Sequence, residues 1–187
     1  LTVWCWPFWR TVALTAARIL QNLMPNPSFE RGITAGLPES WDALIGAPGT
    51  SELSTAWAKY GLNSYHIVAA AGSRRGIQEN ITGLTQNTIY AVYVWGNVIS
   101  GTLRIRLSQD NGGVTNLLNI FSTGTGVQRV SGLYTTQAGQ TNCYTEVITN
   151  SDASEWYADG VYFALASNTT GAVPTEWVSY TQDLYNH

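Results

Sequence analysis

Charge is scarce in this chain, and that scarcity excludes several classes of partner. Asp, Glu, Lys and Arg make up 11% of the 187 residues, against about 25% in an average soluble domain. The net charge is −3 and the basic pair Arg74–Arg75 stands alone, so no basic surface for nucleic acid is expected. No apolar run approaches the roughly 20 residues of a membrane-spanning helix. We therefore expect neither nucleic acid nor a membrane span.

Residues that carry catalytic chemistry are also few. The two cysteines, Cys5 and Cys143, are too few for a disulfide framework, and we expect free, buried thiols. His66 is the only internal histidine and has no nucleophile motif beside it, which argues against a Ser-His-Asp or Cys-His arrangement. No zinc-ligand cluster or phosphate-binding loop occurs. A carboxylate pair for glycoside cleavage stays open, drawn from Glu30, Glu79, Glu146, Glu155 and Asp159, but we expect a protein that is not an enzyme.

Aromatic residues and strand-forming patterns are abundant instead. Aromatics reach 12%, with eight tryptophans. The nearly all-apolar run Ile89–Val98 predicts a central strand covered on both faces. Leu103, Ile105 and Leu107 alternate with Arg104 and Arg106, as in a half-buried strand, and the Asp-Asn-Gly-Gly run at 110–113 indicates a hairpin. Short strands separated by such turns predict an all-β fold, an antiparallel two-sheet β-sandwich.

The two ends of the chain differ from this middle part. Residues 1–21 form an aromatic arm followed by a short helix expected over Arg10–Gln21. Residues 22–166 form the sandwich, and residues 167–187 form a tail. Clustered rings are costly to leave in water, so the arms either fold back onto their own domain or dock on a neighbouring subunit. The predicted assembly-interface residues are Trp4, Trp6, Phe8, Trp9, Trp177 and Tyr180.

Four motifs in the middle part point to a family. Asn22–Glu30 reads NLMPNPSFE, Pro38-Glu-Ser-Trp41 follows, Gly83-Leu84 precedes Tyr90 and Trp95, and the run Trp156–Phe163 ends the pattern. In this order they resemble the carbohydrate-binding modules of the cellulose- and xylan-binding, galactose-binding-like jelly-roll type, which are also found in phage structural proteins. The match departs from the family pattern at Gly160, where an acid or amide is common.

The resemblance implies a possible cofactor and a ligand site. In that family a structural calcium is often bound by the acids that correspond to Glu30 and Asp159, with backbone carbonyls near Lys59 completing the shell; the alternative is that both acids cap turns or pair with Arg31. Tyr93 and Trp95 share one face of their strand with Asn97, and the position of Trp95 lines the concave groove in the family. We expect Arg104 and Arg106 to supply donors from a neighbouring strand, with Trp41 or Trp57 closing the groove. The alternative is that these rings are core.

The function predicted from these observations is non-catalytic. We predict a carbohydrate-binding-like jelly roll that serves as a structural and interaction module of a larger assembly, namely a phage head-decoration or tail protein on the virion surface. Its partners would be other copies of itself or capsid and tail proteins, with a glycan as ligand. The alternative is a polysaccharide-binding module of a secreted, glycan-degrading enzyme.

Overall fold

The computed structural model describes residues 22–34, 36–44, 49–72, 74–110, 115–150 and 152–166. The aromatic arm and short helix predicted over residues 1–21 lie outside this part of the chain, as does the predicted tail, residues 167–187. The six predicted assembly-interface residues therefore also lie outside it: Trp4, Trp6, Phe8, Trp9, Trp177 and Tyr180.

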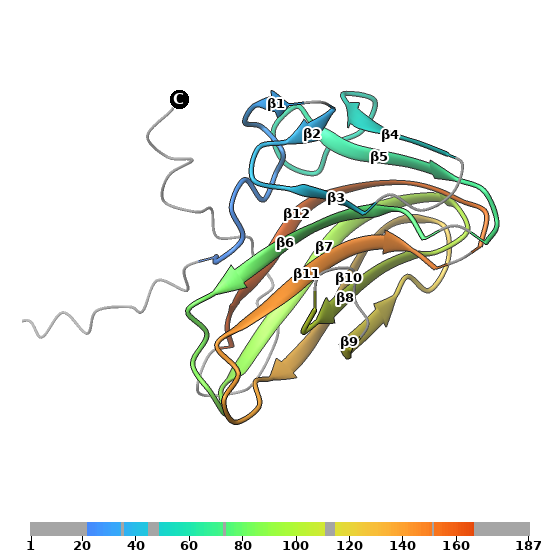
Figure 1. Ribbon diagram of the computed structural model, residues 1–187. Helices are drawn as coiled ribbons and strands as arrows, with labels where there is room; N and C mark the ends of the chain where they lie inside the picture. The colour runs from blue at the N-terminus through green and yellow to red at the C-terminus, as the bar shows by residue number, and fades with distance from the viewer. Residues whose placement is uncertain are drawn as a thin grey trace, which may run out of the picture.

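Two five-stranded sheets dominate the described residues (Figure 1). Sheet I has the order β10-β7-β12-β5-β4, and sheet II has the order β3-β6-β11-β8-β9. All strand pairings in both sheets are antiparallel. The predicted antiparallel two-sheet sandwich is therefore confirmed. The strands of sheet I are β10 (Gly126–Thr135), β7 (Ile89–Ser100), β12 (Ser154–Leu165), β5 (Ser64–Ala69) and β4 (Gly49–Ser54). Those of sheet II are β3 (Asp42–Leu44), β6 (Gly76–Thr82), β11 (Asn142–Thr149), β8 (Leu103–Ser108) and β9 (Asn116–Phe121), and a small separate pair joins β1 (Ile33–Thr34) to β2 (Leu37–Pro38).

The core lies between the two sheets and follows the period of two that strand geometry imposes. Leu103, Ile105 and Leu107 of β8 point into it, and all three are at most 1% exposed. On the opposite sheet, β7 is paired on both sides, with β10 and with β12. Its residues Val92, Val94 and Val98 belong to the same core. The prediction that the Ile89–Val98 run is central in its sheet is confirmed.

One topological prediction is wrong. The sequence pattern predicts Arg104 and Arg106 on a strand beside Tyr93 and Trp95, but β7 lies in sheet I and β8 lies in sheet II. The connection between them is only Gly101 and Thr102. Gly101 has a φ of +67°, and a Cβ there would lie 2.3 Å from the Ala153 carbonyl oxygen. The chain therefore crosses from one sheet to the other in a tight turn that glycine permits, instead of forming a hairpin within one sheet.

A second, smaller cluster of buried side chains lies on the outer face of sheet I, away from the core. It consists of Ala91, Tyr93, Tyr162, Ala164 and Ala166, with Trp95 packed against it. The rings of Tyr93 and Tyr162 stack with centroids 4.6 Å apart and an interplanar angle of 8°. Within the part of the chain that the structure describes, no helix has the length and apolar character to cross a membrane.

Candidate functional site

Glu30 and Asp159 hold the loop that joins β4 to β5. Asp159 Oδ2 accepts hydrogen bonds from the backbone N–H groups of Lys59 and Tyr60, both at 2.6 Å. Glu30 Oε1 accepts from the N–H groups of Leu62 and Asn63 at 2.8 and 2.7 Å. Charge-assisted bonds of this kind are about twice as strong as neutral ones. The two acids therefore anchor both halves of one loop.

These contacts bear on the calcium prediction. Calcium takes six to eight oxygen ligands, whereas both carboxylates here receive N–H donors. Among the described residues, no group of three or more Asp, Glu, His or Cys side chains is placed to hold a metal. The described contacts fit a hydrogen-bonded loop anchor and not an oxygen cage. Calcium at Glu30 and Asp159 stays a prediction.

Burial affects the chemistry of Asp159, which is fully buried. The pKa of Asp159 is raised to about 7, mainly by desolvation and also by the charge of Glu30, against the lowering effect of the N–H bonds from Tyr60, Lys59 and Gly160. The neighbouring Gly160 has a φ of +59°, and a Cβ there would lie 2.6 Å from the ring of Tyr60. The departure of Gly160 from the family pattern thus has a steric reason, because the Tyr60 ring occupies the side-chain position.

The aromatic residues predicted to bind a ligand lie in three different settings. Trp41 is 4% exposed and belongs to the core, where its Nε1 donates to the Asn26 carbonyl at 3.3 Å. Tyr93 is 1% exposed, and the guanidinium of Arg129 lies 5.2 Å from its ring centre. Trp95 is half-buried, with the Lys59 ammonium 4.1 Å from its ring centre. For Trp41 the alternative reading, that the ring is core, is the one that the structure supports.

Trp57 lies near the other side chains of the outer face of sheet I. Its ring centre is 6.5 Å from that of Tyr157 on β12. Tyr157 also stacks on His66 of β5, with centroids 4.2 Å apart. His66 lies between two carboxylates, Glu52 at 3.6 Å and Glu155 at 3.3 Å. His66 is thus a packed, partly buried residue on the outer face of sheet I.

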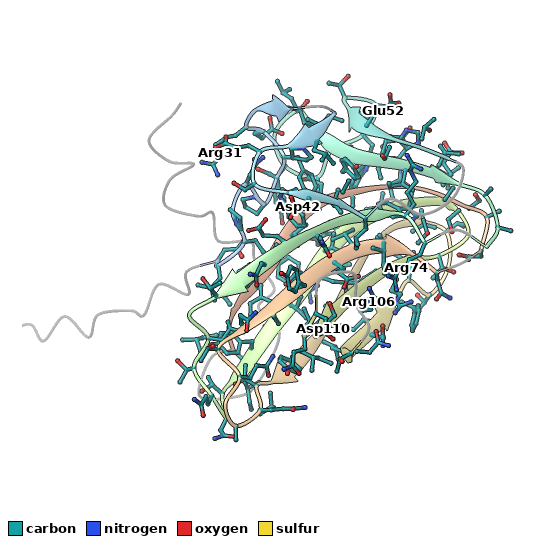
Figure 2. All side chains as sticks on the ribbon, in the orientation of Figure 1. Arg31, Asp42, Glu52, Arg74, Arg106 and Asp110 are labelled. Carbon is teal, nitrogen blue, oxygen red and sulfur yellow. The ribbon has the colours of Figure 1, made fainter. Side chains whose placement is uncertain are left out.

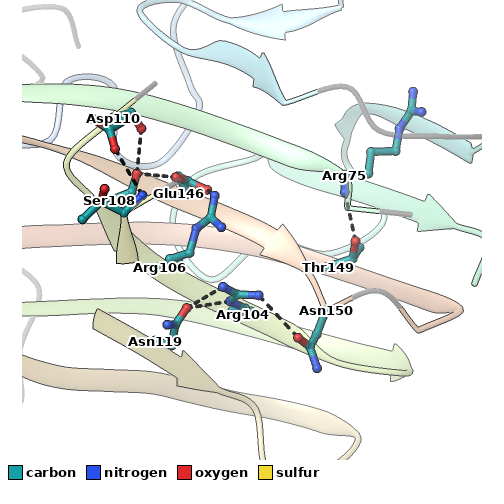
Figure 3. A network of polar contacts seen from close by, with 10 residues as sticks. Arg75, Arg104, Arg106, Ser108, Asp110, Asn119, Glu146, Thr149 and Asn150 are labelled. Atoms are coloured by element: carbon teal, nitrogen blue, oxygen red, sulfur yellow. Dashed lines mark hydrogen bonds and ion pairs between the residues drawn. The ribbon is translucent and has the colours of Figure 1, made fainter. Parts of the chain in front are cut away.

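The outer face of sheet II carries a different set of side chains. Arg106 on β8 forms an ion pair with Glu146 on β11, and the side chains are 2% and 0% exposed. The Ser108 hydroxyl donates to Glu146 Oε1 at 2.5 Å. Figure 3 shows these residues converging from neighbouring strands. A buried charge must be paired and hydrogen-bonded, and this arrangement meets that requirement while lying outside the core.

Arg104 lies on the same face, two residues from Arg106. Its Nε donates to Asn119 Oδ1 on β9 at 3.0 Å, and its Nη1 donates to Asn150 Oδ1 at 3.4 Å (Figure 3). The ring of Phe121 lies 5.4 Å from the guanidinium carbon and is 42% exposed. Tyr144 of β11 is directly opposite Ser108 and is half-buried. We call the side chains of Arg104, Arg106, Ser108, Asn119, Phe121, Tyr144 and Glu146 the arginine face.

Three comparisons place this architecture among known proteins. No protein-family model matches the sequence, and no curated protein matches it either. Among solved structures, a family 16 carbohydrate-binding module matches with a TM-score of 0.58 and 17% identity, over 76% of this chain and 99% of that chain. A family 22 xylan-binding domain from Paenibacillus barcinonensis matches with a TM-score of 0.56 and 18% identity, over 80% of this chain and 97% of that one.

The chain has the jelly-roll fold of carbohydrate-binding modules. A tailspike protein of bacteriophage CBA120, described as its enzymatically active domain, also matches with a TM-score of 0.60 and 12% identity over 77% of this chain. The chain spans 21% of the length of that tailspike structure. At these identities the likeness establishes the fold of the carbohydrate-binding modules and not a ligand.

Within this carbohydrate-binding-module fold, the sequence predicted only part of the arginine face. Arg104 and Arg106 were predicted as ligand-binding residues and lie on it. Glu146, Tyr144 and Phe121 were missed as partners of these arginines. A usable signal was present for Tyr144 and Glu146, because they alternate with the apolar Cys143 and Val147 along one strand. The face therefore joins two of the predicted residues to neighbours that only the pairing of β8 with β11 and β9 identifies.

Proposed function

We propose that this chain is a non-catalytic glycan-binding module and that the arginine face is its binding surface. The observation that carries the proposal is the set of accessible side chains Arg104, Asn119 and Phe121 on the outer face of sheet II, next to the buried network of Arg106, Glu146 and Ser108. These side chains are held in place before any ligand arrives, and preorganised donors and acceptors reduce the ordering cost of binding. Binding sites for small molecules generally combine a few positioned polar groups with aromatic surface.

The energetics of the ion pair support a role in recognition. A buried salt bridge typically contributes little net stability, because desolvation offsets the Coulomb attraction. An apolar pair of similar volume at Arg106 and Glu146 would hold the two strands about as well. A buried pair that adds little to folding is better explained by its role in fixing the more exposed side chains beside it, Arg104 and Tyr144, for a ligand. Phe121 and Tyr144 supply rings beside it on which a sugar ring can stack.

The experiment compares two alanine variants, Phe121→Ala and Leu133→Ala, at positions on opposite sheets whose side chains are almost equally exposed. Phe121 is 42% exposed on the arginine face, and Leu133 is 41% exposed on β10 of sheet I. We expect Phe121→Ala to weaken binding about 10-fold on a glycan array, since loss of one aromatic contact costs roughly 1–2 kcal/mol. Leu133→Ala should bind as the wild type does. Equal affinities for both variants would place the binding surface elsewhere.

Trp95→Ala tests the other candidate surface. Trp95, Tyr93 and Trp57 were predicted as ligand-binding residues and occupy the outer face of sheet I. Loss of glycan binding in a folded Trp95→Ala protein, with Phe121→Ala unaffected, would move the site to sheet I. We expect the opposite result, because the Lys59 ammonium lies 4.1 Å from the Trp95 ring centre, closer than the 5.4 Å between the Arg104 guanidinium carbon and the Phe121 ring centre.

We further propose that the module belongs to a larger assembly, a virion head-decoration or tail protein. Two features support this: the sequence carries aromatic arms at both ends, and a phage tailspike has the same fold over part of its length. Size-exclusion chromatography with light scattering on the whole chain, and on a chain without residues 1–21, tests it. Oligomers that need the arm are expected, and a monomer indifferent to its removal would count against assembly.

A second candidate is a polysaccharide-binding module of a secreted glycan-degrading enzyme. It is favoured by the family 22 domain, named xylan-binding, which this fold covers over 97% of its length. Binding to insoluble xylan in a pull-down, together with a monomeric chain in solution, would favour this candidate over a virion protein.

A further inference from the structure

Three of the basic residues of this acidic protein lie close enough to interact with one another. The chain has nine Lys and Arg residues against twelve Asp and Glu. Three of those nine, Arg74, Arg104 and Arg106, interact electrostatically with one another on the outer side of sheet II. Figure 2 shows Arg74 and Arg106 on the same side of the molecule. The adjacent Arg75 is not part of this group, because its Nη2 donates to Ser51 of β4 in sheet I.

Among the described residues, these guanidinium groups outnumber the carboxylates that act on them. Glu146 is the acid that acts on Arg74 and on Arg104, and it is already paired with Arg106. Asp110, two residues after the end of β8, accepts a hydrogen bond from the backbone N–H of Thr115 at 3.1 Å. Asp42 lies opposite Gln78 on the edge strand β3, and two strands, β6 and β11, separate β3 from β8. Within the described part of the chain, Arg74, Arg104 and Arg106 all interact with Glu146, so positive charge outnumbers negative charge around that carboxylate.

Arg104 is the guanidinium best placed to use that surplus. Its hydrogen bonds go to the side-chain amides of Asn119 and Asn150, which carry no charge. Those bonds occupy three of its five N–H groups. They also fix the plane of the guanidinium, whose fork matches a carboxylate in a two-point contact. Burial together with repulsion from Arg106 lowers the pKa of Arg104 below its ordinary value, and a bound anion would relieve that repulsion.

We propose that the arginine face selects an anionic glycan and that Arg104 contacts the carboxylate of an acidic sugar. This inference rests on the proposed function, since it names the ligand class of the same surface. A neutral chain of sugars would leave the charge of Arg104 uncompensated as water is displaced, which is costly. An acidic sugar replaces that water with a charge-assisted pair.

The test measures binding of the whole chain to polygalacturonate, alginate and hyaluronate, each beside its carboxyl-reduced, neutral counterpart, with xylan as a further neutral probe. We expect at least a 10-fold preference for one acidic polysaccharide over its reduced form, which weakens as salt rises. Arg104→Gln should abolish that preference. Arg129→Gln is the matched control, because it removes one arginine from the outer face of sheet I, and it should retain the preference.

The outcomes separate this inference from the proposed function. Equal binding to acidic and reduced forms, or binding to xylan alone, would overturn the inference and leave glycan binding in place. Binding to none of the polysaccharides would count against both. Binding to dextran sulfate that is as strong as binding to the acidic polysaccharides, and that is unchanged in Arg104→Gln, would show general attraction to polyanions. That result would also overturn the inference.

Discussion

Removing the charge of Glu146 is the perturbation that most directly probes the arginine face. Glu146→Gln keeps the shape of the side chain but takes the counter-charge from Arg106. Both side chains are almost completely buried, at 0% and 2% exposure. Arg106 would then be a desolvated cation whose former carboxylate partner is a neutral amide. Breaking a buried pair by removing one partner is strongly destabilising for this reason.

The expected magnitude follows from that burial. Loss of one partner of a buried pair costs about 3–5 kcal/mol of unfolding free energy. For a domain of this size, each kcal/mol lowers Tm by roughly 2–4 °C. We therefore expect Glu146→Gln to melt about 10 °C below the wild type, within a factor of two.

A double variant shows whether the pair serves folding or binding. Arg106→Met with Glu146→Leu removes both charges and keeps apolar volume, and the Ser108 hydroxyl retains the Asp110 carbonyl as an acceptor at 3.1 Å. We expect its stability to lie within about 1 kcal/mol of the wild type or above it, with glycan binding lost. Urea unfolding and the glycan array measure the two effects separately.

Two results would refute this reasoning. A change of less than about 1 kcal/mol in Glu146→Gln would mean that water reaches the carboxylate, as at an exposed pair. A double variant as unstable as the single one would mean that the ion pair itself stabilises the sandwich. Its place on the outer face would then need no ligand to explain it.

Three further predictions concern other parts of the fold. Asp159→Asn replaces an acceptor oxygen by an amide donor beside the N–H groups of Lys59, Tyr60 and Gly160, and it should lower the unfolding free energy by about 2–4 kcal/mol in thermal unfolding. EDTA should leave the Tm of the wild type unchanged. A fall in Tm that calcium chloride restores would support the calcium prediction and contradict the loop anchor. Gly160→Ala should lower the unfolding free energy by more than the roughly 1 kcal/mol expected for Gly139→Ala. Both glycines have positive φ, but of the two only a Cβ at position 160 would meet an atom within 4 Å. Equal losses of stability in urea unfolding would argue against the Tyr60 contact. Burial and the charge of Asp42 raise the pKa of Glu79 from 4.5 to about 7, so its contribution to stability is fully present below pH 4.5 and is lost as pH rises through 7. Glu79→Gln should therefore gain about 1–2 kcal/mol over the wild type between pH 5 and pH 8, after allowance for solvent screening at this half-buried site; a difference that does not change with pH would refute the shift.

The fold could be predicted because its signals are local. The alternation of Leu103, Ile105 and Leu107 with the two arginines predicts a strand whose apolar side faces the core, and the structure has that strand. The prediction that its other side is exposed is wrong, because Arg106 and Ser108 are also buried. The apolar run Ile89–Val98 required a central strand, which β7 is. Motifs such as NLMPNPSFE added the family resemblance. Two residues of this motif have clear structural roles: Phe29 is buried in the core, and Glu30 accepts hydrogen bonds from the loop after β4.

The candidate site could be predicted only in part. The sequence pattern correctly placed Tyr93, Trp95 and Asn97 on one side of their strand and Arg104 and Arg106 on one side of theirs. It contained no information on whether those two sides belong to the same sheet. The two-residue crossing at Gly101 and Thr102 puts them on opposite faces of the sandwich.

The sequence by itself determined which residues form strands, which side of each strand is apolar, and that two sheets close on a common core, because these follow from the period of two and from turn residues close to one another in the chain. Only the tertiary structure decided which strands are neighbours. Arg106 and Glu146 lie 40 residues apart, and the hydrogen bonds between strands that bring them together depend on sheet order and register, which no local pattern specifies. The arginine face exists because of that pairing.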